Sequence, residues 1–65
     1  MRILVNGAWR EAAAMTLASV LEELGYADSI VATALNGEFV PASARGGARV
    51  SEGDRLEVLA PMQGG

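Results

Sequence analysis

The chain has 65 residues, which is close to the smallest size at which one domain folds on a single hydrophobic core. Half of the residues (51%) are apolar and 20% are charged, a balance that favours a folded domain over a disordered chain. With 5 basic and 8 acidic residues the net charge is −3, so the sequence lacks the basic surface typical of a nucleic-acid-binding protein.

Cysteine and histidine are both absent from the sequence. This excludes disulfides, zinc sites with the usual ligands, thiol nucleophiles and imidazole bases. The sequence also offers no pair of a nucleophile and a base that would indicate a stand-alone enzyme. No apolar run is long enough to span a membrane, and no signal peptide starts the chain. We therefore expect a cytoplasmic protein with no catalytic residues and no metal site, whose partners include neither nucleic acid nor membrane.

The first predicted element is a β-hairpin. Residues 2–5 (RILV) are an apolar, partly β-branched run, and Asn6-Gly7 follows them directly. Asn-Gly favours a type I′ turn, because both turn residues need a positive φ. Residues 8–12 supply the returning strand, and Trp9 is predicted to pack over the hairpin.

An amphipathic helix is predicted next, with Thr16 as its N-cap and Gly25 just past its C-terminal end. Its apolar stripe follows the i, i+3, i+4, i+7 spacing and consists of Leu17, Val20, Leu21 and Leu24. We expect Glu22 and Glu23 to lie on the solvated face. Such a short helix is marginal alone, so the stripe must pack on a sheet.

Three further strands are predicted in the second half of the chain. Residues 30–35 and 38–40 flank a second Asn-Gly pair, and Pro41 ends the shorter strand. Residues 42–49 have no periodicity and predict a loop. After a turn at residues 51–54, residues 55–59 form the last alternating strand.

Within that loop, Arg45 and Arg49 are expected to be surface charges. Gly46-Gly47 lacks the preceding strand and following helix that a phosphate-binding loop requires.

This order of elements predicts an α+β fold, the ubiquitin-like β-grasp, with a mixed sheet of four to five strands and one helix packed across one face. The first and last strands are expected to lie side by side in the middle as a parallel pair. We expect residues 1–61 to form the domain and residues 62–65 a flexible tail. The predicted core consists of Ile3, Val5, Leu17, Val20, Leu21, Leu24, Thr33, Leu35, Leu56 and Val58.

The sheet face opposite the helix is predicted to be a partner-docking surface. Successive side chains of a strand point to opposite faces, so this face should carry Leu4, Ala32, Ala34 and Leu59. A flat apolar surface next to the end of the last strand suits protein docking.

The tail consists of Met62, Gln63, Gly64 and Gly65. Glycine has no Cβ, so two terminal glycines can present an α-carboxylate inside a slot too narrow for other residues. A frayed chain end is the ordinary alternative for such a segment.

Four segments together resemble the bacterial sulfur carriers of thiamine biosynthesis, the ThiS family. They are residues 1–7 (MRILVNG), 35–41 (LNGEFVP), 52–58 (EGDRLEV) and the Gly64-Gly65 end. The resemblance spans essentially the whole chain with matching spacing.

The resemblance implies that Gly65 is modified, first to an acyl adenylate and then to a thiocarboxylate. The implied partners are a ThiF-type adenylating enzyme that uses ATP, a sulfur donor protein, and a ThiG-type thiazole synthase that receives the sulfur. The carrier would bind no cofactor and would be a cosubstrate and not an enzyme. Gly64 would allow passage through a narrow channel, and Gln63 and Met62 would set the reach of the tail.

Two other functions remain open at this point. The small subunit of molybdopterin synthase has the same fold, tail and activation chemistry but serves a pterin product. A β-grasp binding module whose tail never reacts is the second alternative, and in that case Gly65 could be removed without consequence.

Overall fold

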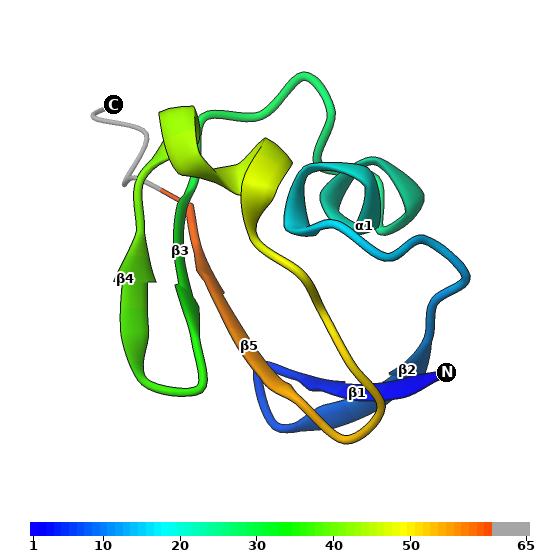
Figure 1. Ribbon diagram of the computed structural model, residues 1–65. Helices are drawn as coiled ribbons and strands as arrows, with labels where there is room; N and C mark the ends of the chain where they lie inside the picture. The colour runs from blue at the N-terminus through cyan, green and yellow to red at the C-terminus, as the bar shows by residue number, and fades with distance from the viewer. Residues whose placement is uncertain (61–65) are drawn as a thin grey trace.

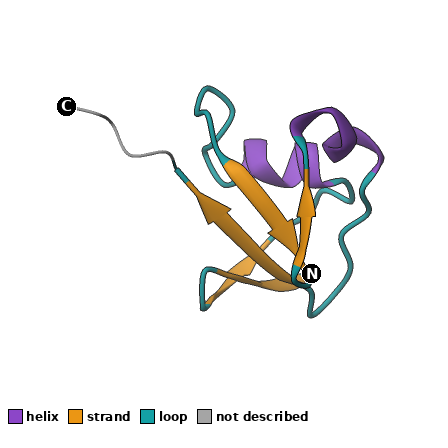
Figure 2. Cartoon of the chain, turned by 90° about the vertical axis from the view of Figure 1, so that its left-hand side faces the viewer, coloured by secondary structure: helices purple, strands orange, loops and turns teal. Residues whose placement is uncertain are grey.

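The fold is a five-stranded mixed sheet with one α-helix and one short 3₁₀-helix on the same side of it (Figures 1 and 2). The computed structural model describes residues 1–60, so the predicted tail and the predicted domain limit at residue 61 lie outside the described residues. The elements are β1 (Arg2–Val5), β2 (Ala8–Glu11), α1 (Leu17–Glu23), β3 (Ala32–Leu35), β4 (Glu38–Val40), the 3₁₀-helix η1 (Ala42–Gly47) and β5 (Arg55–Leu59).

The strand order is β2-β1-β5-β3-β4, and it confirms the predicted topology. β1 and β5, from the two ends of the described chain, form a parallel pair at the centre of the sheet, with Val5 opposite Leu56. All other pairings are antiparallel. With one α-helix of the described residues across one face, this sheet is the predicted ubiquitin-like β-grasp.

Both predicted Asn-Gly turns are present and join the two hairpins. Asn6 and Gly7 have φ of 49° and 84°, and Asn36 and Gly37 have φ of 52° and 86°. These positive values at both turn positions are what a type I′ turn requires, and asparagine tolerates them better than most residues. The turns therefore fix the register of both strand pairs.

Side-chain and backbone hydrogen bonds close both ends of helix α1. Thr16 is the N-cap, and its Oγ1 accepts a hydrogen bond of 3.3 Å from the backbone N–H of Ser19. At the other end Gly25 has φ of 94°, and the N–H of Tyr26 donates to the carbonyl of Leu21 at 2.9 Å. This is the Schellman arrangement, in which a left-handed glycine lets the chain turn back over the last carbonyls.

The hydrophobic core lies between the sheet and α1. Eight of the ten predicted core residues are buried, whereas Leu24 and Leu35 are partly buried at its margin. The core also contains three residues that the periodicity did not select: Ala12, Val31 and Val50. Val50 points inward because residues 48–50 run antiparallel to the start of α1, where the Val50 N–H donates to the Met15 carbonyl at 2.8 Å.

The predicted loop at residues 42–49 is wrong over most of its length, because Ala42–Gly47 form η1. Pro41 precedes this helix with φ of −68°, and its carbonyl accepts a 2.9 Å hydrogen bond from the Ala44 N–H. No residue of η1 is buried, so an apolar pattern was not required for it to form.

Arg45 is also not the simple surface charge that we predicted. Its Nη2 donates to the Val31 carbonyl at 2.6 Å, and its Nε donates to the Thr33 Oγ1 at 3.1 Å. The guanidinium thereby links η1 to the beginning of β3, which explains why η1 contains an arginine at this position.

The strand predicted for residues 30–35 is shorter in the structure, where β3 begins at Ala32. Ala32 is paired with Leu59, the last residue of β5, so residues 30 and 31 have no partner on that strand. The length of β5 therefore sets where β3 begins.

Candidate functional site

The predicted modification site lies at the end of the chain, beyond the part that the structure describes. Met62, Gln63, Gly64 and Gly65 are all outside residues 1–60. What the structure does show is the element that leads to them, because Ala60 follows directly after β5, the central strand of the sheet.

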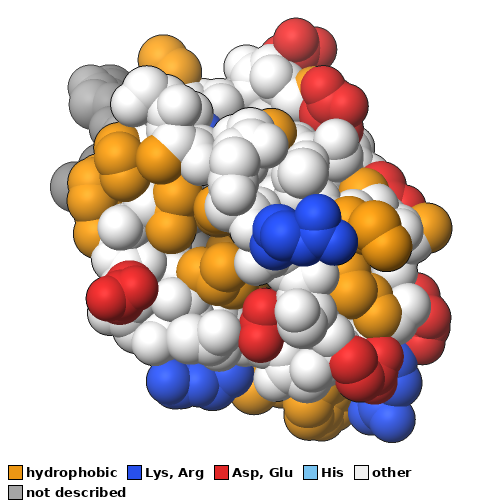
Figure 3. Space-filling model, viewed as in Figure 1, with side chains coloured by type: hydrophobic (Ala, Val, Ile, Leu, Met, Phe, Trp, Pro, Cys, Tyr) orange, Lys and Arg blue, Asp and Glu red, His pale blue; other side chains and the backbone are white. Residues whose placement is uncertain are grey.

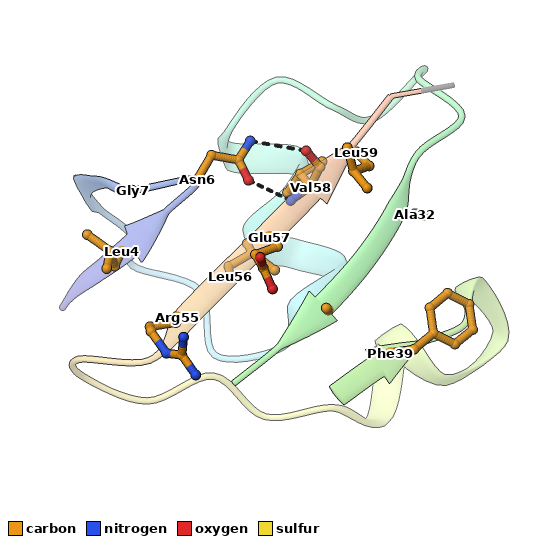
Figure 4. Close-up of a pocket in the computed structure, with 11 residues that line it drawn as sticks. Leu4, Asn6, Gly7, Ala32, Phe39, Arg55, Leu56, Glu57, Val58 and Leu59 are labelled. Atoms are coloured by element: carbon orange, nitrogen blue, oxygen red, sulfur yellow. Dashed lines mark hydrogen bonds between the residues drawn. The ribbon is translucent and has the colours of Figure 1, made fainter. Parts of the chain in front are cut away.

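The four predicted docking residues come together on the sheet face opposite α1. Leu4, Ala32, Ala34 and Leu59 all line one open concavity of about 650 Å³, which crosses β1, β5 and β3 (Figure 4). Its complete lining is Leu4, Asn6, Gly7, Ala32, Ala34, Phe39, Arg55, Leu56, Glu57, Val58 and Leu59. Their role in docking stays a prediction, but their proximity is a property of the fold.

Strand alternation is the reason that these side chains share a face. On β5, Leu56 and Val58 are buried under α1, whereas Leu59 is 71% exposed on the other side. The pairing of Ala32 with Leu59 then places β3 side chains next to it. Small alanine side chains leave this part of the sheet shallow and open.

Sequence reasoning missed Phe39, which is 69% exposed and lines the same concavity from the edge strand β4. Phe39 is paired with Ala34, a residue already assigned to the outer face. Because residues directly opposite each other share a face, this register could have identified Phe39. We define the outer apolar surface as Leu4, Ala32, Ala34, Phe39 and Leu59.

A second, smaller hollow extends the outer apolar surface toward the end of β5. It has a volume of about 380 Å³ and is lined by Ile30, Val31, Ala32, Leu59 and Ala60. Ile30 is 83% exposed. In Figure 3, hydrophobic side chains gather on the left of the view, where the ribbon of Figure 1 shows β3 and β4. The apolar area thus reaches the last described residue.

Two charged side chains, Arg55 and Glu57, lie on β5 within the same face. They alternate with the buried residues of that strand, and both are exposed. Their charges limit non-specific association of an otherwise apolar surface.

Trp9 stays on the first hairpin, as predicted. The Arg2 guanidinium lies 4.8 Å from the centre of its ring, a cation–π contact between the two strands. Trp9 is opposite Leu4 in the sheet register, so the aromatic ring borders the outer apolar surface.

Glu23, the carboxylate whose pKa is shifted, lies on α1, on the other side of the sheet from the outer apolar surface. Its carboxylate oxygens accept hydrogen bonds from the N–H groups of Ala13 (3.0 and 3.1 Å) and Ala14 (2.8 Å). These bonds, from Ala14 first and then Ala13, lower the pKa of Glu23. Glu22 and Glu23 are both exposed, as predicted, but the sequence did not show that Glu23 bonds these two backbone N–H groups.

Within residues 1–60, no three acidic side chains gather where they could hold a metal ion. Every buried side-chain nitrogen or oxygen in that part of the chain has a hydrogen-bond partner. No helix among the described residues has the length and apolar character needed to cross a membrane.

The strand order, the single helix and the apolar outer face define a small ubiquitin-like β-grasp protein. The model of the ThiS family matches residues 3–65. The chain belongs to the ThiS family.

Two relatives extend this result. A crystal structure of the thiamine biosynthesis protein ThiS from Geobacter metallireducens superposes with a TM-score of 0.83 at 30% identity, and the match covers 100% of both chains. A thiazole synthase from Paramagnetospirillum magneticum is 39% identical over 66 residues, covering 100% of this chain and 20% of that protein. The chain therefore spans about a fifth of the length of this curated relative. These findings support a role as a sulfur carrier in thiamine biosynthesis.

Proposed function

We propose that the chain carries sulfur for thiazole formation as a thiocarboxylate on Gly65. The observation that supports this most directly is the extent of the family match, which runs over residues 3–65 and so includes Gly64 and Gly65. The proposed division into a domain of residues 1–61 and a tail of residues 62–65 follows from the same function, since the tail must enter a partner's active site.

The chemistry needs only a free carboxylate on the carrier. A carboxylate is a poor electrophile, so a ThiF-type adenylating enzyme would first join it to AMP from ATP, releasing pyrophosphate. A hydrosulfide ion supplied by a donor protein would then attack the acyl carbon, so that a C–S bond forms as the C–O bond to AMP breaks, and loss of the thiol proton would leave a thiocarboxylate. The carrier binds no cofactor in this scheme, because its partner holds the ATP, and the use of ATP fits a location in the cytoplasm.

A ThiG-type thiazole synthase is the proposed receiver of the sulfur. The thiazole synthase of Paramagnetospirillum magneticum contains a segment similar to the whole of this chain, which supports a functional link between the two proteins. We propose that Gly64 allows passage through a narrow channel, whereas Gln63 and Met62 set the reach of the tail.

Deleting Gly65 tests the proposed modification. The deletion should abolish ATP–pyrophosphate exchange catalysed by a ThiF-type enzyme and leave the far-UV circular dichroism spectrum unchanged, since the last strand of the described residues ends at Leu59. A variant with one additional C-terminal glycine should fail in the same way. Normal exchange with either variant would instead support a binding module whose tail does not react.

Intact mass provides an independent measurement on the unaltered protein. Chain purified from cells that are making thiamine should include a species about 16 Da heavier, because sulfur replaces oxygen in the carboxylate. Absence of that species under active thiamine synthesis would contradict the proposal.

We propose further that the outer apolar surface docks on the adenylating enzyme. Leu59→Glu places a charge within that surface, at the end of β5, so it should raise the Kd for the enzyme by about tenfold or more. Met15→Glu is the matched control, because Met15 is 62% exposed and lies before α1, away from this surface. Equal affinities of the two variants would remove the outer apolar surface from the docking interface.

A further inference from the structure

The side chain of Asn6 is bonded to the backbone of β5 at the point where the chain leaves the sheet. Its Nδ2 donates to the Val58 carbonyl at 3.0 Å, and its Oδ1 accepts from the Val58 N–H at 2.8 Å (Figure 4). Fifty-two positions separate the two residues in the sequence. One turn residue therefore satisfies both backbone groups of Val58, the residue before the last one of β5.

This contact continues the parallel ladder after its backbone partner has ended. The Leu4 N–H donates to the Asp54 carbonyl, and the Asn6 N–H donates to the Leu56 carbonyl, both at 2.9 Å. Alternate residues of β5 thus direct their backbone groups toward β1, and Val58 is next in that series. β1 ends at Val5, so the primary amide of Asn6 takes the place of the missing peptide group.

Asparagine meets two requirements at this position. The backbone has φ of 49°, which asparagine and glycine tolerate better than other residues. The side chain must also offer one donor and one acceptor in a single plane, which glycine and aspartate cannot do. The turn alone explains an Asn or a Gly here, whereas the contact with Val58 requires the amide.

Asn36 in the second hairpin makes the corresponding contact at the other end of β5. Its Oδ1 accepts from the Arg55 N–H at 2.9 Å, and its Nδ2 donates to the Asp54 Oδ1 at 3.1 Å. The two turns share the same sequence and the same backbone conformation. Asn36 thus holds the beginning of β5, and Asn6 holds its end.

We propose that Asn6 is a positioning residue for the carrier reaction, which fixes the direction in which the chain leaves the sheet toward Gly65. This inference rests on the proposed function. Beyond Leu56, β5 has a strand partner only on the β3 side, where Ala32 opposite Leu59 is the final pair. Without the Asn6 amide, Val58 and Leu59 have a strand partner on the β3 side only, and this end of β5 frays more readily.

We call the two hydrogen bonds between the Asn6 amide and the Val58 backbone the Asn6 clamp. The clamp is tested on the free protein by NMR, in which Asn6→Gly is compared with Asn36→Gly. Glycine preserves the positive φ of the turn, and denaturant unfolding verifies that both variants fold. Asn6→Gly should speed amide hydrogen exchange at Val58 by about tenfold or more and lower the ¹⁵N order parameters of Leu59 and Ala60. Asn36→Gly should leave those three residues as in the parent chain. Unchanged exchange and order parameters in Asn6→Gly would overturn the proposal.

The consequence for the reaction is tested by ATP–pyrophosphate exchange with a ThiF-type enzyme. Asn6→Gly should lower kcat by about fivefold and change KM by less than about twofold, because docking remains but the carboxylate is less often in place. Asn36→Gly should keep both parameters. An equal loss in the two variants would show a general loss of stability and overturn the positioning role. If the parent chain supports no exchange, the proposed function fails, whereas the NMR comparison still decides the clamp.

Asn6→Asp distinguishes the donor from the acceptor. The carboxylate can still accept from the Val58 N–H but cannot donate to its carbonyl, so kcat and the Val58 exchange rate should lie between those of the parent and Asn6→Gly. An aspartate variant as impaired as Asn6→Gly in both readouts would mean that positioning requires the bond donated to the Val58 carbonyl, because a carboxylate oxygen in that place repels the carbonyl oxygen.

Discussion

The two faces of the sheet differ in what covers them, and β5 belongs to both. Leu56 and Val58 lie against the layer formed by α1 and η1, while Arg55, Glu57 and Leu59 point away from it. Because successive side chains of a strand alternate, the buried and the exposed sets are only one residue apart in the sequence. The fold thus places buried core side chains and exposed side chains on opposite sides of a single strand.

The residue types on the two faces agree with this division. The inner face carries branched aliphatic side chains, together with Thr33, whose Oγ1 donates to the Val40 carbonyl at 2.8 Å. The outer face has two alanines at its centre and isolated charges among the larger apolar groups. A flat, apolar and sparsely charged face costs little when a partner removes it from water.

Truncation of two leucines of β5 that point to opposite faces should give the largest contrast between the faces. Leu56 is 1% exposed, so Leu56→Ala should lower the free energy of unfolding by about 2–5 kcal/mol, which could unfold so small a domain. Leu59→Ala on the outer face should change it by less than about 0.5 kcal/mol. Urea unfolding followed by circular dichroism measures both. Similar losses at the two positions would show that the outer face is also packed.

Hydrogen bonds from the Arg45 side chain also hold η1 on the sheet, and removing them should have the next largest effect on stability. Arg45→Ala leaves the Val31 carbonyl and the Thr33 Oγ1 without their guanidinium donors. We expect a loss of about 1–3 kcal/mol in the free energy of unfolding. Arg45→Lys keeps the charge but not the planar fork, so it should recover only part of that loss. Full recovery with lysine would mean that charge alone holds η1 in place.

Local patterns were sufficient to predict most of the sheet and its outer face. The two Asn-Gly pairs marked the hairpins, Thr16 and Gly25 marked the ends of the helix, and alternation assigned Leu4 and Leu59 to one face. Each of these signals depends on neighbouring residues in the chain. The parallel pairing of β1 with β5 could also be predicted, since few arrangements of these elements bury the apolar stripe of the helix.

Contacts between distant segments account for what the sequence did not show. Arg45 contacts Val31, 14 positions away, and Val50 is buried because residues 48–50 pair with the segment before α1. Asn6 looked like a turn residue, and only the structure shows its amide on Val58. Side chains that bond to remote backbone groups leave no periodic trace in a sequence.

The smallest predicted effect concerns Glu23, whose carboxylate accepts hydrogen bonds from the segment between β2 and α1. Its hydrogen bonds from Ala14 and Ala13 lower its pKa in the folded state below the ordinary value of 4.5. The resulting stability is therefore present above about pH 4.5 and is lost as the pH falls through the lowered pKa of the folded state.

Glu23→Gln should accordingly reduce the midpoint of thermal unfolding at pH 7, and its curve should converge with that of the parent chain as the pH is lowered past 4.5. Glu22→Gln is the matched control, because it removes the same charge from the exposed neighbouring position of α1. Its difference from the parent should be smaller at pH 7, since no backbone N–H groups are bonded to Glu22 among the described residues. Parallel pH curves for Glu23→Gln and the parent would show that the carboxylate does not hold the segment that leads from β2 into the helix.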